Sequence, residues 1–578
     1  MPEVFIDGKR FEFEGSPTLL QFIMDQGMEV PYFCYHPSMS APANCRQCLV
    51  KVGTPVKDRE TGEFELDENG KRKIRWFPKL QPSCKMDVSD GMVVKTQEVD
   101  EEVERAQKDN LEFILINHPL DCPICDQAGE CPLQIQTYKY GPEGSRFEVQ
   151  KAHKPKRVQL GPRVTLDAER CINCTRCVRF TEEISGTEQL TIVSRGDKNY
   201  PATAPGEEFD DPYSLNTVDI CPVGALTSSD FRFKARVWEM NQTPSIDITN
   251  GKGTNVDLWT RDNLILRITP RFNKEVNEWW MPDAGREAYK KFNENRVSRP
   301  SIKLDEGQQT KTSWNNAIET FAEILEAHES DDILVIGSPH ASVEENYSFN
   351  KFFNLLAVDN AKYASHIIPG AGDDFLLTDD QAPNTNGCRL LDLDEADSKT
   401  LKSAVSSSKV IIILSDELID REVLSAKDLE KPYVITLATN NTETAKASDL
   451  VIPITCIAEH AASYVNVDGR VQRSQPAKET KYTNRSLNLE MSEGRLDRFG
   501  TNFDNWITEE NKVDCLPVWE FLNKLADRLG LDYQYDHSRA VMSDIASSIP
   551  SFEEVTYDRM DEEQGIQLSL EQKELKQD

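Results

Sequence analysis

The sequence predicts a multidomain protein that combines small α+β domains with one larger α/β domain. Three observations lead to this prediction. The chain has 578 residues, which at about 150 residues per domain leaves room for about four domains. Eleven of its 14 cysteines lie before residue 222, in tight groups. After residue 298, apolar stretches that suit strands alternate with helical stretches, as in a largely parallel sheet.

The composition narrows the class of function. The formal net charge of −32 repels phosphate backbones, so we expect no nucleic-acid partner. No apolar run approaches the roughly eighteen residues of a membrane helix, and the N-terminus lacks the basic and apolar stretches of a signal peptide. We therefore expect a soluble chain in a reducing compartment, which contacts a membrane only through other subunits.

The first predicted domain covers residues 1–97 and is rich in strands. Val4–Ile6 and Phe11–Phe13 alternate in strand fashion around the turn residues Asp7-Gly8. Thr18–Met28 has the apolar spacing of a helix. These features predict a small β-rich domain with one helix.

A hairpin is predicted as an insertion in this domain, at about residues 52–80. Phe64 and Leu66 precede the turn pair Asn69-Gly70, and Ile74 and Trp76 follow it. The stretch is unusually charged. We therefore expect the hairpin to be exposed.

Further boundaries follow from changes of pattern along the chain. Residues 98–117 predict an amphipathic helix, and the proline-rich stretch that follows predicts loops. The last 28 residues carry nine acids against three bases, which predicts a solvated or partner-bound tail. The expected domains after the first are 98–145, 146–240, a β-rich domain at 241–297, the α/β domain at 298–545, and an acidic tail at 546–578.

The first set of candidate metal ligands consists of four cysteines in the β-rich domain. They are Cys34, Cys45, Cys48 and Cys84. One close pair with two outlying cysteines resembles the plant-type [2Fe–2S] arrangement, with a wider first gap. Thiolates suit iron because they are soft, anionic donors. A structural zinc site remains an alternative for this pattern.

The second set combines one histidine with three cysteines inside a proline-rich loop. It consists of His118, Cys122, Cys125 and Cys131. Zinc also accepts three thiolates and one imidazole. An imidazole in place of a thiolate removes one negative charge, which should raise the reduction potential of an iron–sulfur cluster, as in Rieske centres.

The third set has a triple of cysteines with two-residue gaps, followed by a distant Cys-Pro pair. It consists of Cys171, Cys174, Cys177 and Cys221. This spacing is close to the ferredoxin run that holds a [4Fe–4S] cluster, and zinc sites seldom use it. Arg170, Arg176 and Arg179 flank the set, either to offset an anionic cluster or as a solvated face.

The order of these three sets resembles the large iron–sulfur subunit of respiratory complex I, the NADH:quinone oxidoreductase. A second stretch, residues 447–477, is similar to a segment of molybdopterin oxidoreductases. The resemblance implies an N-terminal β-grasp [2Fe–2S] ferredoxin-like domain, two small cluster-binding domains, and a degenerate molybdopterin-oxidoreductase-like α/β domain at 298–545.

The resemblance also implies a function as an electron relay. The Cys34 set would hold the [2Fe–2S] cluster, and the Cys171 and His118 sets would each hold a [4Fe–4S] cluster. Electrons would enter from an NADH- and FMN-binding subunit beside a small [2Fe–2S] subunit, and would leave through a ferredoxin-like subunit with eight irons toward quinone. The complex would be a translocase, with this chain in its peripheral arm at the cytoplasmic face of a bacterial inner membrane. The chain itself would have no catalytic residue.

The sequence departs from the family pattern after the third set. Some members carry a fourth cluster, and the matching positions here are Asp247, Asn250 and Thr254, which cannot supply thiolates. Gly370-Ala-Gly372 is followed by two aspartates, which disfavour a phosphate. We therefore expect no fourth cluster and no molybdopterin. Three cysteines are expected to be ordinary buried thiols, namely Cys388, Cys456 and Cys515.

Other functions are possible for a front end of this kind. One alternative is a molybdopterin-dependent catalytic subunit similar to formate dehydrogenase, which would need a catalytic cysteine near the start of the α/β domain. A second is the relay subunit of an NAD-reducing hydrogenase, which should end soon after the third set. An iron-only hydrogenase would need further cysteines, but residues 222–387 contain none. The last alternative is a scaffold stapled by zinc.

Overall fold

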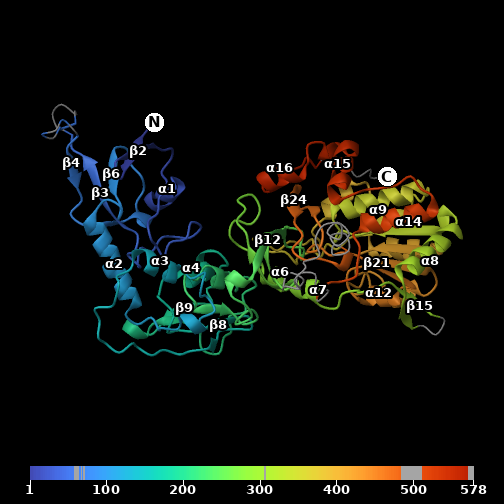
Figure 1. Cartoon of the computed structure of the whole chain (residues 1–578), viewed down its shortest axis with the longest axis horizontal. Coiled ribbons are helices and arrows are strands. Elements are labelled where there is room, and N and C mark those ends of the chain that lie inside the picture. The colour runs from blue at the N-terminus through green and yellow to red at the C-terminus, as the bar shows by residue number, and fades with distance from the viewer. Residues whose placement is uncertain are drawn as a thin grey trace, which may run out of the picture. The chain divides into compact units, whose positions relative to one another are not determined.

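The computed structural model describes residues 1–57, 64–66, 68, 70, 72–304, 308–482 and 511–570. It divides into two compact units, Met1–Glu239 and Met240–Asp578 (Figure 1). This division falls at the end of the predicted 146–240 domain; the other predicted boundaries lie inside the units and remain predictions. Among the described residues, no helix is long and apolar enough to cross a membrane.

The first unit begins with the expected β-rich domain. Strands β1 (Glu3–Ile6) and β2 (Lys9–Glu12) pair antiparallel around Asp7 and Gly8, whose φ angles of 51° and 80° suit a tight hairpin turn. Strand β6 (Met92–Lys95) pairs parallel to β1 and antiparallel to β3 (Leu49–Pro55). Helix α1 (Leu19–Asp25) packs its apolar side chains into the same core.

The predicted hairpin insertion extends this sheet. Strand β4 (Ile74–Trp76) pairs antiparallel with β3, and single bridges join Lys57 to Phe64 and Leu66 to Arg72. Leu66 is 62% exposed, as expected for an outward insertion. Asn69 of the predicted turn lies outside the described residues.

Two helices frame the second ligand set. Helix α2 (Glu101–Leu115) confirms the predicted helix, and Asp100 caps it by accepting hydrogen bonds from the amides of Glu102 and Val103. The following stretch is not all loop, because α3 (Pro132–Tyr140) begins within it. Proline is favoured at the first helical position, where no amide hydrogen is needed.

A three-stranded sheet organises the rest of this unit. Its order is β11-β8-β7, with β11 at Leu226–Ser228, β8 at Val164–Leu166 and β7 at Val158–Gln159. Leu166 pairs with Leu226, so chain segments on either side of the third ligand set meet. The other elements are α4 (Arg176–Glu183), β9 (Thr191–Val193), β10 (Tyr200–Ala202) and α5 (Asn216–Asp219).

The second unit opens with the predicted β-rich segment. Strands β12 (Asn241–Ile246), β13 (Asn255–Arg261) and β14 (Leu264–Pro270) form an antiparallel meander. Two short helices follow, α6 (Asp283–Glu287) and α7 (Tyr289–Asn293).

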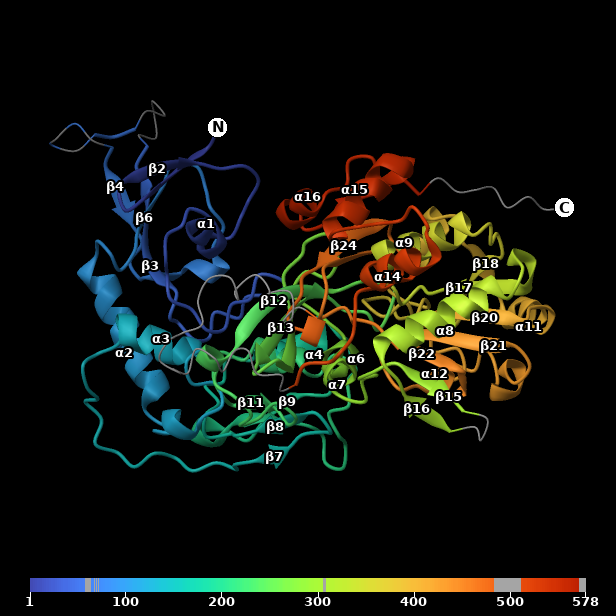
Figure 2. The same ribbon diagram turned by 45° about the vertical axis from the view of Figure 1, so that its right-hand side comes forward.

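An eight-stranded sheet forms the centre of the α/β part (Figure 2). Its order is β16-β15-β22-β21-β20-β17-β18-β19, and β17 through β22 run parallel. The outer strands are β15 (Ser301–Lys303), β16 (Gln309–Lys311), β18 (Ala361–Ala364) and β19 (Asp394–Ala396). The sequence predicts four apolar strands here, at Ile333–Ile336, Val410–Leu414, Val434–Leu437 and Leu450–Ile454, and each is confirmed to within one residue at each end. They are β17 (Ile333–Gly337), β20 (Val410–Leu414), β21 (Tyr433–Ala438) and β22 (Leu450–Pro453).

Helices cover both faces of this sheet. Val335 and Ile412 face a core shared with α8 (Trp314–Glu326), α9 (Val343–Leu355) and α14 (Val518–Leu529). Leu334 and Ile411 face the opposite core, which includes α11 (Ser398–Ser407). This alternation is the period of a strand buried on both faces, and it confirms the α/β class.

The predicted acidic tail differs from the structure over its first part. Residues 546–570 contain α16 (Tyr557–Glu562) and β25 (Ile566–Gln567), and β25 pairs with β24 (Arg470–Ser474). Phe552 is fully buried in the main core. The apolar residues between the acids anchor this segment, and acid content alone did not reveal them. Residues 571–578 lie outside the described residues.

Candidate cluster-binding sites

The first ligand set gathers where β3 meets the segment after the insertion. Cys45 and Cys48 lie in the loop before β3, and Cys84 lies in a short 3-10 turn (Ser83–Lys85). The Ser83 amide and hydroxyl donate to the Cys48 carbonyl oxygen at 3.0 and 2.8 Å, which holds Cys84 beside Cys48. The long gap between these two cysteines is therefore closed by local pairing.

The sulfur atoms of this first set contact one another. Cys34 receives hydrogen bonds from Cys45 and Cys84, which lower the pKa of its thiol. The hydrogen bond that the Cys45 thiol makes to Cys34, together with burial, raises the pKa of Cys45. Ligand thiolates must shed such protons before they bind a metal. The structure thus brings all four members of the set together.

The second set surrounds the turn between α2 and α3. His118 follows α2, Cys122 begins a 3-10 turn (Cys122–Ile124), and Cys131 caps the N-terminus of α3. Burial raises the pKa of the Cys131 thiol to about 11, against the effect of the helix amides. Helix N-termini favour thiolates, so this position suits a ligand once a cation replaces the proton.

His118 is prepared for ligation on one side of its ring. Burial lowers the pKa of His118 to about 4, with help from Lys151 and Arg170, so the imidazole is neutral. The Arg170 backbone is a hydrogen-bond partner of the ring, while Nδ1 is buried with no partner among the described residues. One fixed nitrogen and one free nitrogen is the usual state of a histidine ligand.

The third set lines a single cavity. Its wall consists of the four cysteines and mainly apolar neighbours such as Ile172, Ile192 and Val223. The β8–β11 pairing brings Cys221 to the Cys171 end of the loop. Burial raises the pKa of Cys171 to about 11 and that of Cys221 to about 12. The Asn173 amide donates to the Cys171 sulfur at 3.4 Å, a bond of the kind that tunes cluster potentials.

Residues next to the third set contact the second set and a neighbour of the first set. The Cys131 sulfur lies 3.6 Å from the Pro222 carbonyl oxygen, and a side chain added at Gly224 would meet the Cys125 sulfur at 2.2 Å. On the other side, the Asn44 side chain donates to the Asn173 carbonyl oxygen at 3.3 Å. The all-cysteine set therefore adjoins the Cys34 set and the His118 set within one compact unit.

None of the three sets has the geometry of a mononuclear site. Among the residues that the structure describes, no three His, Cys, Asp or Glu side chains are arranged to hold a single metal ion.

The three positions that the sequence matched to a fourth cluster of some family members are buried polar residues. Asp247, Asn250 and Thr254 are each at most 3% exposed, and each has one side-chain atom with no hydrogen-bond partner among the described residues. Asp247 lies against Gly285, where a Cβ would meet its Oδ2 at 2.1 Å. No thiolate is available here, so these residues do not fit an iron–sulfur cluster.

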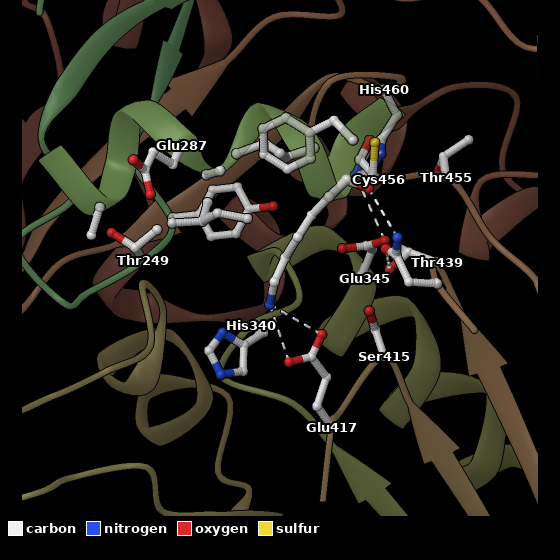
Figure 3. Close-up of a pocket in the computed structure, with 18 of the residues that line it drawn as sticks. Thr249, Glu287, His340, Glu345, Ser415, Glu417, Thr439, Thr455, Cys456 and His460 are labelled. Atoms are coloured by element: carbon white, nitrogen blue, oxygen red, sulfur yellow. Dashed lines mark hydrogen bonds and ion pairs between the residues drawn. The ribbon is translucent and has the colours of Figure 1, made fainter. Parts of the chain in front are cut away.

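A second cavity, of about 370 Å³, lies in the α/β unit at the carboxyl ends of its parallel strands (Figure 3). His340, Ser415 and Thr439 line it after β17, β20 and β21. Ligands bind α/β sheets at this edge, where the strand order reverses. Lys291 also lines the cavity, and its Nζ donates to the Glu417 carboxylate at 3.2 and 3.3 Å.

The groups that would bind an anionic cofactor in this unit are held by the chain's own carboxylates. The amides of Gly370 and Gly372 donate to Asp379 at 3.1 and 2.9 Å, where a phosphate would need them. Lys291 is paired with Glu417. The residues present therefore do not fit a molybdopterin dinucleotide, and its absence remains our prediction.

The three later cysteines are buried, as expected. Cys388 packs against Tyr363 in a small apolar cluster. Cys456 differs from an ordinary core thiol because it lines the second cavity and accepts a hydrogen bond from Arg296 at 3.3 Å. Sequence spacing gave no indication of that contact, which joins positions far apart in the chain.

Family models match successive parts of the chain between residues 3 and 488. The matches are a 2Fe-2S iron-sulfur cluster binding domain (3–99), the NADH-ubiquinone oxidoreductase-G iron-sulfur binding region (107–146), the ferredoxin-like domain of NADH-quinone oxidoreductase subunit 3 (161–227), the NDSU1/NuoG-like 4Fe-4S domain (240–290) and molybdopterin oxidoreductase (296–401 and 384–488).

Curated relatives point to the same kind of protein. The G subunit of NADH-quinone oxidoreductase from Rickettsia conorii (strain ATCC VR-613 / Malish 7) is 36% identical over 360 residues, which is 62% of this chain and 50% of the relative. Over these 360 residues the chain is similar to the G subunit of an NADH-quinone oxidoreductase. The G subunit of Rickettsia felis (strain ATCC VR-1525 / URRWXCal2) matches with the same identity and the same coverage.

These matches confirm the predicted resemblance and the predicted fold class of this chain. The fold class includes [2Fe–2S], [4Fe–4S] and molybdopterin-oxidoreductase-type domains. The chain spans about half the length of the curated relatives it matches.

Two solved structures are similar over parts of the chain. One is an NAD+-reducing [NiFe]-hydrogenase, 26% identical with a TM-score of 0.33, covering 41% of this chain and 91% of that one. The other is acetylene hydratase from Pelobacter acetylenicus, 9% identical with a TM-score of 0.39, covering 57% and 74%. Neither overlay is close enough to carry an argument.

The matched 4Fe-4S domain at 240–290 contains no cysteine. Asp247, Asn250 and Thr254, the positions that the sequence analysis matched to cluster ligands, are carboxyl, amide and hydroxyl residues. A pH-dependent effect on stability follows from the buried carboxyl group there.

Asp247→Asn should stabilise the second unit in a pH-dependent manner. Burial raises the pKa of Asp247 to about 6 from its usual 3.8, so its protonated form favours folding below pH 4 and that contribution is lost as pH rises through 6. The charged carboxylate then costs up to about 3 kcal/mol. Unfolding curves at pH 4 and pH 8 should show the variant gaining stability over wild type mainly at pH 8. Asp262→Asn, at an exposed carboxylate, serves as control, and an equal gain at both pH values would contradict this explanation.

Gly224→Ala should disrupt the second ligand set. The added methyl group would lie 2.2 Å from the Cys125 sulfur, so that sulfur or the loop must move. We expect a loss of the [4Fe–4S] signal of the His118 set in electron paramagnetic resonance (EPR) spectra. Gly144→Ala is the matched control, because nothing lies within 4 Å of its Cβ position. Full retention of that signal would show that the contact is unimportant.

Proposed function

We propose that this chain is an electron-relay subunit of an NADH:quinone oxidoreductase. The observation that carries the proposal is the grouping of three four-ligand sets in one compact unit, with the all-cysteine set adjoining both others. Iron–sulfur clusters supply one-electron transfer when bound. Homology to the G subunits of these oxidoreductases supports the same conclusion.

The proposed ligands follow the three sets. Cys34, Cys45, Cys48 and Cys84 would hold a [2Fe–2S] cluster; His118, Cys122, Cys125 and Cys131 a [4Fe–4S] cluster; and Cys171, Cys174, Cys177 and Cys221 a second [4Fe–4S] cluster. The chain would hold no fourth cluster and no molybdopterin. Its own residues would supply ligands, burial and hydrogen bonds, and no residue would act on a substrate.

The environment of each set suits electron transfer without bond chemistry. Of the eleven cysteine ligands, only Cys122 is exposed, and the third set lines a cavity with an apolar wall. Water is thereby kept from sulfur and iron, and few protein groups need to reorganise when charge changes. Burial and hydrogen bonding are the protein's means of setting a cluster potential.

The partners and location are part of the same proposal. We infer that an NADH- and FMN-binding subunit with a small [2Fe–2S] subunit supplies electrons, and that a ferredoxin-like subunit with eight irons receives them on the way to quinone. The chain would belong to the peripheral arm, at the cytoplasmic face of a bacterial inner membrane. Membrane contact would come through other subunits.

Metal analysis and EPR of the full chain test the relay. About ten irons and ten acid-labile sulfides per chain are expected, with one binuclear and two cubane signals on graded reduction. Stoichiometric zinc or molybdenum would overturn the proposal. A third cubane signal would contradict the assignment of Asp247, Asn250 and Thr254 as non-ligands.

His118→Cys should lower the reduction potential of one cubane only. A thiolate in place of neutral imidazole adds one negative charge, which disfavours a further electron. EPR-monitored redox titration should show the shift at one [4Fe–4S] centre while the others keep their potentials. His153→Cys, at a side chain that is 92% exposed, is the control. An unchanged set of potentials would show that His118 is not a ligand.

A further inference from the structure

Two arginines beside the third set are buried, and this decides between the two interpretations that the sequence left open. Arg170 is 4% exposed and Arg179 is 6% exposed, so neither belongs to a solvated face. Arginine keeps its charge in proteins even where it is buried. Each guanidinium is therefore a fixed positive charge inside the first unit.

Arg179 joins the first and third sets. It lies on α4, two residues beyond Cys177, and its guanidinium donates to the main-chain oxygens of Cys34 and Ser40. It also donates to the Thr175 hydroxyl at 3.3 Å. These three acceptors are neutral, so none of them cancels the charge of the guanidinium.

The charge of Arg179 acts on ligands of both sets. Its electrostatic influence reaches Cys34 and Cys174, and, together with the larger effect of Arg176, it opposes the effect of burial on the pKa of Cys174. Glu183 and Arg176 are the other charged groups that act on Arg179, through space and with opposite signs. Their effects on the guanidinium therefore oppose each other, and its positive charge persists between the two sets.

Arg170 joins the third and second sets. It precedes Cys171 directly, its backbone bonds to the His118 ring, and its charge acts on Cys125. Asp121 accepts two of its hydrogen bonds, at 3.0 and 3.1 Å, which offsets part of the charge.

Other charged groups surround Arg170. Asp167 lies 3.3 Å away, and Lys156 pairs with Asp121 at 2.9 Å. Nη1 of Arg170 is buried without a partner among the described residues. A buried cationic donor is costly to leave unpaired, so an anionic acceptor is expected on that side.

The electrostatic consequence follows from the position of each charge. Reduction adds one negative charge to a cluster, and a nearby buried cation favours the reduced form because screening by water is weak there. A cation between two clusters acts on both. The effect should be larger for Arg179, whose hydrogen-bond acceptors are neutral, than for Arg170, whose charge Asp121 offsets in part.

We propose that Arg179 and Arg170 are positioning residues that each tune two neighbouring clusters together, Arg179 the Cys34 and Cys171 sets and Arg170 the Cys171 and His118 sets. This inference rests on the proposed function, because it requires all three clusters. It assigns a shared charge to each of the two places where adjacent sets meet.

EPR-monitored redox titration of the cluster-loaded full chain tests the pattern. Arg179→Gln should lower the midpoint potentials of the [2Fe–2S] and all-cysteine [4Fe–4S] clusters, each by at least a tenfold change in the reduction equilibrium, which is about 59 mV for one electron. It should leave the His-ligated cluster unchanged. Arg170→Gln should lower the potentials of the two cubanes, by less, and spare the binuclear cluster.

Further variants separate charge from structure. Arg179→Lys and Arg170→Lys keep the positive charge, so the midpoint potentials of the clusters should stay close to those of wild type. Asp121→Asn removes the offsetting carboxylate and should shift the His-ligated cluster upward, opposite to Arg170→Gln. Arg195→Gln, at an exposed arginine of the same unit, should change nothing.

Failure of the relay and failure of the shared tuning give different results. If the wild-type chain does not assemble three clusters, the relay itself fails. If it does, and both glutamine variants leave all potentials unchanged or shift all three equally, the pairwise assignment is overturned. If the glutamine variants lose clusters, the lysine variants and Asp121→Asn test the pairwise assignment instead. An unchanged midpoint potential of the His-ligated cluster in Asp121→Asn would then refute the role of Arg170.

Discussion

The antiparallel pairing of β8 with β11 is the contact on which the first unit depends. It joins Leu166 to Leu226 and so brings the Cys-Pro segment back to the cysteine triple, far away in the sequence. The returning segment closes the cavity of the third set. The same segment then meets the second set, through the Pro222 carbonyl oxygen beside Cys131 and through Gly224 beside Cys125. One short ladder of backbone hydrogen bonds thus positions ligands for two sites.

Features that depend on local spacing could be predicted from the sequence. The three ligand sets, the Asp7-Gly8 hairpin and the four parallel strands all follow from periods and turn residues that neighbours in the chain determine. The sequence does not predict helix α3, because its prolines indicate loops although one of them begins the helix. The packing of residues 546–570 was also missed, since a few apolar anchors such as Phe552 outweigh the surrounding acids.

The spacing of residues in the sequence does not predict contacts between distant segments of the chain. Whether Arg170 and Arg179 face solvent depends on which loops fold over them, and no local pattern encodes that. The same holds for the bond from Arg296 to Cys456 and for the orphaned Nδ1 of His118. Motifs therefore identified the candidate ligands, and the tertiary structure supplied their surroundings.

The α/β part matches the molybdopterin oxidoreductase model, and its own carboxylates pair with groups that could bind an anionic cofactor. Asp379 holds two glycine amides and Glu417 holds Lys291, so charges that would attract an anionic cofactor are already balanced. Among the described residues, Asp247, Asn250 and Thr254 still carry buried polar atoms without partners. These positions offer no thiolate to a metal, and their polar side chains are buried within the second unit.

Gly224 illustrates how tightly two sites can constrain one residue. The space of its missing side chain is occupied by the Cys125 sulfur, while three positions earlier the chain supplies Cys221. A substitution in this turn must therefore satisfy both ligand shells at once, and a compensating change in one shell cannot repair the other. Over evolutionary time such a segment can drift only if both shells change together, so it should diverge more slowly than either loop would alone.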